Sequence, residues 1–145
     1  MTSEEHTPKE RVRWLEQWSP ETAEAFCEAA LEYGVTLDYS PESLREVERL
    51  IRENFTDRRG RVKKKWRNLS GAIGAYVTEV ILRNLGGRWD WEPEFEVAGV
   101  RLPSGTFTAP LAKSRKRLEE GEGDDFVSYY YVLADSESDR AQSPE

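Results

Sequence analysis

Residue types that commonly do chemistry are few in this sequence. The only histidine is His6 and the only cysteine is Cys27, so Ser–His and Cys–His catalysis lack a base in the expected folded region. Two such residues are also too few for a zinc site. The sequence has no Walker-type phosphate loop, no dinucleotide-binding glycine fingerprint and no EF-hand spacing. We expect no metal and no cofactor, and a non-enzymatic protein is favoured while an enzyme stays open.

Carboxylates are the remaining candidates for chemistry. Asp38 follows a predicted helix, Glu79 lies in the middle of another, and Asp90 and Glu92 lie on a predicted strand. A pair of carboxylates can catalyse hydrolysis. The chain has 28 Asp and Glu in 145 residues, so such pairs also arise by chance and assign no activity by themselves.

Glu79 is the most informative of these carboxylates. It lies on a mostly apolar helix, three residues after Tyr76 and four before Arg83, and Glu and Arg at this spacing can pair on one helix face. One interpretation is a half-buried ion pair that ties the helix to a sheet. The other is a binding pocket floored by Glu79 and walled by aromatic side chains. Its other members would be Tyr76, Trp89 and Trp91, with Arg101 or Lys113 nearby.

Charge is distributed unevenly along the chain. Residues 1–57 carry a net charge of −8, residues 58–117 carry +9, and residues 118–145 carry −8. Seven of the ten residues from Arg58 to Arg67 are cationic: Arg58, Arg59, Arg61, Lys63, Lys64, Lys65 and Arg67. Clustered Lys and Arg beside an aromatic residue are typical of a nucleic-acid or phosphate contact. The alternatives are a solvated connection offset by the acidic flanks, or an acidic tail folded back upon it.

The elements that would position these residues form an α+β domain. The 145 residues suit one domain, and five Trp, six Tyr and five Phe supply a core although only 37% of residues are hydrophobic. Helix-start signals predict three helices in the N-terminal half, over 8–18, over 19–33, and from the Ser40-Pro41 start signal to near Asn54. A central helix follows over 69–85, and its Gly71 and Gly74 indicate close packing.

The C-terminal half combines a small sheet with two helices. Alternating residues predict strands over 88–92 and 95–102, with a short third strand over 106–108 in an antiparallel sheet of two to three strands. Helices are predicted over 110–118 and from Phe126 onward. Residues 1–7 and 135–145 are expected to be disordered around a single domain over 8–134.

The predicted strand and last helix also carry candidate contact surfaces. Trp89 and Trp91 are two residues apart on a strand, so both should face one side. They either cover the helices as core or form an exposed protein-contact site. Tyr129, Tyr130 and Tyr131 cannot all be buried on one helix face, so at least one should be exposed.

Three segments resemble a group of uncharacterised bacterial proteins. Residues 74–80 and 84–89 are similar to its "GAYxGEV…LGGxW" core, residues 38–44 to its "LDYSxESL" segment, and residues 110–121 to its "PFxKVxKRLxNG" segment. The departures are Thr78 in place of Gly and Leu111 in place of Phe. The resemblance spans roughly residues 35–133 and implies a shared domain without a particular activity. It singles out Tyr76, Glu79 and Trp89.

Three functions follow as hypotheses. The leading one is a non-enzymatic protein-interaction domain, of an immunity or regulatory type, suggested by the acidic net charge of −7 and the aromatic candidates. The second is a small-molecule-binding or hydrolytic domain centred on Glu79, and the third is nucleic-acid binding through Arg58 to Arg67. The single cysteine, the polar N-terminus and the lack of a long apolar run predict a cytoplasmic protein. The sequence does not indicate an oligomeric state.

Overall fold

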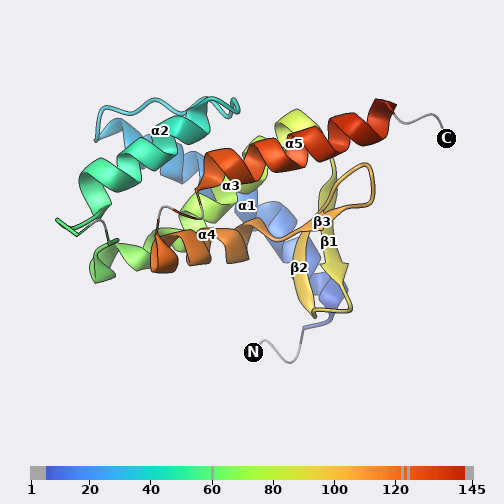
Figure 1. Ribbon diagram of the computed structural model, residues 1–145. Coiled ribbons are helices and arrows are strands. Elements are labelled where there is room, and N and C mark those ends of the chain that lie inside the picture. Colours follow the sequence, from blue (N-terminus) through green and yellow to red (C-terminus); the bar gives the residue numbers. More distant parts are fainter. Residues whose placement is uncertain (1–5, 60, 122, 124, 143–145) are drawn as a thin grey trace.

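The computed structural model describes residues 6–59, 61–121, 123 and 125–142. It has the expected α+β arrangement of helices and a three-stranded antiparallel sheet. Figure 1 shows the sheet at one end of the molecule and the η2–η3 segment at the other. The elements are α1 (Pro8–Leu31), α2 (Ser43–Leu50), η2 (Ile51–Phe55), η3 (Lys64–Leu69), α3 (Ser70–Leu85), β1 (Arg88–Glu92), β2 (Val97–Arg101), β3 (Phe107–Thr108), α4 (Pro110–Glu120) and α5 (Phe126–Gln142).

The first helix is continuous, which corrects the prediction of two helices divided at Ser19 and Pro20. Ser19 does not cap a new helix, because it is fully buried and its Oγ donates a hydrogen bond to Glu79. A proline inside a helix typically costs about 3 kcal/mol, and packing of α1 along α3 offsets that cost. The single helix begins at Pro8. Its N-cap is Thr7, the last residue of the arm predicted to be disordered, and the Thr7 side chain accepts a hydrogen bond from the N–H of Glu10. Residues 1–5 of that arm lie outside the described residues.

Helix α3 is the central helix, and every residue from Ile73 to Ile81 is buried. At Gly74 a Cβ would lie 2.8 Å from Leu111 Cδ2 and 3.2 Å from Leu111 Cα, so glycine permits the close approach of α4. At Gly71 the nearest atoms are ring carbons of Trp18 at 3.8 Å, which is ordinary contact. Of the two glycines expected to serve close packing, Gly74 does so and Gly71 does not.

The sheet follows the predicted strand order closely. β1 pairs antiparallel with β2, and β2 pairs antiparallel with β3. The second strand begins at Val97 rather than at the predicted Phe95, because residues 93–96 form the turn of the hairpin and Glu96 adopts a positive φ of 50°. Phe95 is 69% exposed in this turn.

The last helix is longer than predicted. Residues 135–142, expected to be disordered, continue α5 as helix, while residues 143–145 lie outside the described part. Glu137 holds this end in place, because its carboxylate accepts hydrogen bonds from the N–H and the hydroxyl of Ser104. Leu133, one turn earlier, is buried in the core. Tertiary contacts therefore order a segment whose composition alone predicts disorder.

Candidate functional site

Glu79 is buried between α1 and α3, and only 9% of its side chain is exposed. Its Oε2 accepts a hydrogen bond from Ser19 Oγ at 3.2 Å, and its Oε1 lies 3.8 Å from Arg83 Nε. Burial raises the pKa of Glu79, and the hydrogen bond from Ser19 and the charge of Arg83 oppose that rise. The structure thus contains the predicted Glu79–Arg83 pair, but Glu79 links α3 to Ser19 of α1 and not to the sheet as expected.

The other predicted members of the pocket lie elsewhere. The hydroxyl of Tyr76 accepts a hydrogen bond from the N–H of Tyr39 at 2.9 Å and lies 2.6 Å from Ser43 Oγ. The ring of Tyr39 stacks on Tyr76, with centroids 5.0 Å apart, and the Arg83 guanidinium lies 3.5 Å from the Tyr39 centroid. Tyr39 has a positive φ of 64°, a backbone conformation that this packing holds.

The two tryptophans of β1 face one side of the sheet, as predicted. Trp89 is buried, and its Nε1 has no hydrogen-bond partner among the described residues. Trp91 is half-buried, with the Arg11 guanidinium 5.6 Å from its ring centroid. Arg101 pairs with Asp90 and Glu92 on the same strand pair rather than with Glu79.

The predicted pocket is therefore not assembled from these side chains. Lys113 lies over the ring of Tyr129, at 5.5 Å from its centroid, and not near Glu79. Glu79 lines none of three hollows on the surface of the described residues, which lie along α1, beside Glu48 and beside Arg59. Tyr76, Glu79 and Arg83 join α1, the 35–42 loop and α3, which is a role in packing.

A buried ion pair, which the sequence analysis missed, ties α2, α4 and α5 together. The Arg117 side chain is 0% exposed, and its Nη2 lies 2.6 Å from Glu48 Oε1 while its Nε contacts both carboxylate oxygens. Glu48 also accepts a hydrogen bond at 2.9 Å from the N–H of Phe126, the first residue of α5. Arg117 Nη1 has no hydrogen-bond partner within the described part of the chain. A hollow of about 360 Å³ opens beside the pair and is lined by Arg45, Glu48, Arg52, Asp125 and Val127.

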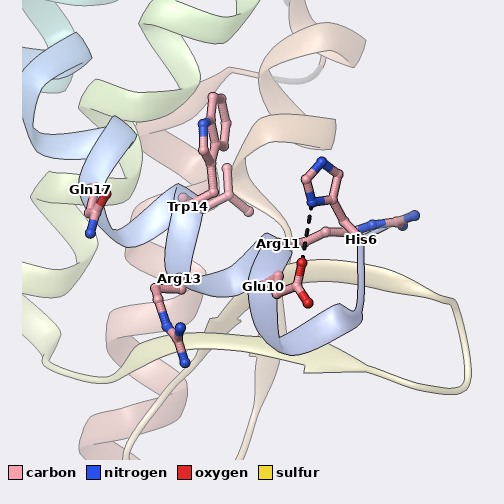
Figure 2. Close-up of a pocket in the computed structure, with 7 residues that line it drawn as sticks. His6, Glu10, Arg11, Arg13, Trp14 and Gln17 are labelled. Atoms are coloured by element: carbon pink, nitrogen blue, oxygen red, sulfur yellow. Dashed lines mark ion pairs between the residues drawn. The ribbon is translucent and has the colours of Figure 1, made fainter. Parts of the chain in front are cut away.

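A larger hollow, of about 710 Å³, lies along the N-terminal half of α1. Figure 2 shows the lining side chains following one another along the helix, from His6 and Glu10 at its start through Trp14 to Gln17. All the described lining residues belong to α1 and the turn before it, so no second element forms an opposing wall among them. Trp14 is 58% exposed and stacks on Trp18 with centroids 5.5 Å apart.

The basic segment, which we define as residues 58–67, is anchored by its apolar members. Thr56 and Val62 form an antiparallel bridge, and Val62 is only 3% exposed. Trp66 packs on the buried Phe55 with centroids 4.8 Å apart. Val62 is thus buried and Trp66 partly buried, while the cations on either side of them are exposed.

The carboxylate nearest the basic segment in sequence, that of Asp57, accepts hydrogen bonds from backbone N–H groups. Asp57 Oδ1 accepts hydrogen bonds from the N–H groups of Arg59 at 2.8 Å and Arg61 at 3.0 Å. These bonds hold the pKa of Asp57 below its ordinary value. The charged guanidinium groups of Arg59 and Arg61 are left on the exposed side of the turn.

The seven cationic side chains of the basic segment are all exposed. Within the described residues, none of them forms an ion pair with a carboxylate. The acidic end of α5 contacts Ser104 at the β2–β3 turn. Figure 1 shows that end of α5 far from the η2–η3 segment. The alternative of an acidic tail folded onto the basic segment is thus wrong for residues 135–142.

The hollow beside the basic segment brings it against the end of α4. Its volume is about 590 Å³. The lining residues from the basic segment include Arg59, Arg61 and Arg67, and those from the end of α4 include Glu119 and Glu120. The remaining lining residues are Val62, Leu118 and Gly121. We call this the Arg–Glu hollow.

No protein-family model, curated protein or solved structure matches the chain. The resemblance to a bacterial family stays a prediction. Within the described residues, no helix combines the length and apolar character that a membrane span requires. The same part of the chain contains no group of three or more His, Cys, Asp or Glu side chains arranged to hold a metal ion.

Proposed function

We propose that this protein is a non-enzymatic domain that binds nucleic acid through the phosphates, using the basic segment. The observation that carries the proposal is the set of seven exposed cations that pair with no described carboxylate. Lys and Arg that neutralise phosphates release condensed counterions, which drives binding irrespective of base sequence. Unpaired cations suit this role because no internal ion pair has to break.

Charge separation along the molecule supports a nucleic-acid ligand despite the net charge of −7. The basic segment and the acidic end of α5 lie at opposite ends in Figure 1. At physiological ionic strength, salt screens the interaction between exposed charges that lie more than about 8 Å apart. A phosphate at the basic segment therefore experiences the local cations more strongly than the distant acidic helix end.

Two anchored positions in the basic segment add to this argument. Val62 is held by the bridge to Thr56, and Trp66 is held by its contact with Phe55. In the 3₁₀ geometry of η3, residues three apart lie on one side. Lys64 and Arg67 therefore project together from η3 and can reach neighbouring phosphates.

The direct test is binding of fluorescently labelled single- and double-stranded oligonucleotides, measured by anisotropy over a series of salt concentrations. We expect affinity to fall linearly on a log–log plot, with a slope of about −0.7 per phosphate contacted for a single strand. The double variant Arg58→Gln/Lys64→Gln removes two cations, and each should reduce the magnitude of the single-strand slope by about 0.7.

A matched control removes the same charge elsewhere. The double variant Lys9→Gln/Arg13→Gln takes two exposed cations from α1 and should leave the salt slope unchanged. Equal losses in the two double variants would mean that only net charge matters. Salt-independent binding, or none at low ionic strength, would remove the proposal.

A protein partner at Trp14 is the second candidate. Trp14 is 58% exposed beside the α1 hollow, and exposed tryptophans are enriched at the energetic centres of interfaces. Cross-linking in the native host followed by mass spectrometry would identify a partner. Trp14→Ala should abolish its binding, whereas Arg58→Gln/Lys64→Gln should not. Loss of binding only in the second variant would reject Trp14 as the contact.

The proposed compartment is the cytoplasm. Cys27 is a free, buried thiol and the only cysteine of the chain. Chains without disulfides suit reducing compartments, where nucleic acid is also present. Localisation of a tagged full-length chain by microscopy and fractionation tests this, and recovery outside the cytoplasm would contradict it.

A further inference from the structure

Resting on the proposed function, we infer that the Arg–Glu hollow binds the terminal phosphomonoester of a nucleic-acid strand together with the nucleotide that carries it. The rest of the basic segment would hold the phosphodiesters that follow. This assigns two roles to one run of cations: Arg59, Arg61 and Arg67 recognise the end of the strand, and the other cations hold its backbone.

The arginines that line the hollow match the charge of a terminal phosphate. A phosphomonoester carries between one and two negative charges at neutral pH, whereas a phosphodiester carries one. Each guanidinium is planar and can donate two parallel hydrogen bonds to phosphate oxygens. Arg59, Arg61 and Arg67 line the hollow, while Arg58, Lys63, Lys64 and Lys65 of the same segment do not.

The glutamates that line the hollow restrict what can accompany the phosphate. Glu119 and Glu120 lie in the last turn of α4, where the helix dipole also disfavours an anion. A bare polyanion running through the hollow would be repelled by these carboxylates. Carboxylates instead accept hydrogen bonds from base amino groups and sugar hydroxyls, which a nucleotide presents at the end away from its phosphate.

The volume of the hollow is sufficient for one nucleotide. Ligand sites commonly measure about 300–1,000 Å³, and this hollow has about 590 Å³. Its apolar lining, Val62 and Leu118, is buried and belongs to the core. The lining residues are thus held by folded elements, the Thr56–Val62 bridge and α4.

The test compares one oligonucleotide with a 5′-phosphate, with a 3′-phosphate and with hydroxyls at both ends, using the full chain. We expect one phosphorylated strand to bind about tenfold more tightly than the hydroxyl strand, the size of one charged hydrogen bond. The preference should fall as pH drops below about 6, where the monoester gains a proton.

Two variants separate the two roles. Arg59→Gln/Arg67→Gln should remove the preference for the phosphorylated end. The matched variant Arg58→Gln/Lys64→Gln should weaken all three strands equally and keep the preference. Circular dichroism of both variants checks that the fold is retained.

The outcomes also distinguish this inference from the proposed function. Equal affinity for the three strands would overturn the terminal-phosphate site and leave phosphate-backbone binding intact. Binding of none of them would overturn the proposed function. A free mononucleotide that binds while no strand does would keep the phosphomonoester site and reject nucleic acid as its source.

Discussion

Arginine is used in opposite ways at two places that adjoin α4. Arg117 is fully buried, and its charge is matched by both oxygens of Glu48. Arg59 and Arg61, which line the Arg–Glu hollow together with the end of the same helix, are exposed and form no ion pair with a described residue. The difference separates a charge that holds the fold from charges that are available to a ligand.

Burial decides whether an arginine needs a paired carboxylate or can remain unpaired at the surface. Removing a charge from water costs several kcal/mol unless a well-aligned partner compensates it. Arg117 has that partner, and Glu48 in turn fixes the first N–H of α5. The exposed arginines retain their water and lose little by staying unpaired. Four predictions test this comparison, from the largest effect on stability to the smallest.

Removing Glu48 should have the largest effect. Glu48→Ala leaves Arg117 buried without a compensating charge and the N–H of Phe126 without its acceptor, so we expect a loss of about 3–5 kcal/mol in the free energy of unfolding. Urea denaturation followed by tryptophan fluorescence measures it. Glu48→Leu/Arg117→Met removes both charges and should recover most of the loss. A cost below about 1 kcal/mol for Glu48→Ala would show that the pair is solvated.

Both places depend on the docking of α4 against α3, which Gly74 permits. Gly74→Ala places a Cβ 2.8 Å from Leu111 and 3.2 Å from Ser114 Cβ, so we expect a loss of about 1–3 kcal/mol from overpacking. Gly71→Ala is the matched control on the same helix, where the space is open to ordinary contact. Better helix propensity should stabilise that variant by up to about 1 kcal/mol. Equal effects of the two changes would contradict the close α3–α4 approach.

Glu79 is an intermediate case, a buried carboxylate with only a weak cationic partner. Burial raises its pKa above the ordinary 4.5, so the folded state favours the neutral carboxyl group. The free energy of unfolding therefore falls as pH rises through the raised pKa of Glu79. Glu79→Gln should therefore stabilise the protein at pH 7 by up to about 1 kcal/mol. The gain should shrink as pH falls and vanish below about 4.5.

Urea unfolding across that pH range measures this effect. Glu21→Gln, at an exposed position of α1, is the control for loss of a carboxylate. A gain that is constant with pH, or equal in the two variants, would mean that Glu79 is not desolvated in the folded protein.

The smallest effect on stability belongs to the exposed cations. Arg58→Gln/Lys64→Gln removes no ion pair formed with a described residue, so we expect the free energy of unfolding to change by less than about 0.5 kcal/mol. The same protein samples serve for denaturation and for the oligonucleotide titration. A clear loss of stability would mean that these cations stabilise the folded state, as Arg117 does.

Local signals in the sequence predict the sheet and the central helix well. Gly86 and Gly87 end α3, and the alternation of side chains from Arg88 to Glu92 coincides with the observed strand. These features are decided by neighbours in sequence. The Ser19-Pro20 start signal is equally local, and it fails because Ser19 is recruited by Glu79, 60 residues away.

The buried ion pair could be predicted from the sequence only in part. Glu48 and Arg117 are 69 residues apart, so no local pattern links them. A signal existed in α2, because Glu48 lies four residues after Leu44 and three before Ile51, on the apolar face of its helix. A carboxylate at such a position needs a buried partner. Which cation supplies it depends on tertiary structure.

The proline within α1 has a consequence for the motions of the molecule. Pro20 has no N–H to donate to the carbonyl of Glu16, so the hydrogen-bond ladder is interrupted between the two halves of the helix. The half after Pro20 buries Ala23, Phe26 and Ala30 in the core, whereas the half before it contains no fully buried residue up to Trp18. One helix then comprises two cooperative units. In native-state hydrogen exchange, the amides before Pro20 should open at lower free energy than those after it, although the helix is continuous in shape.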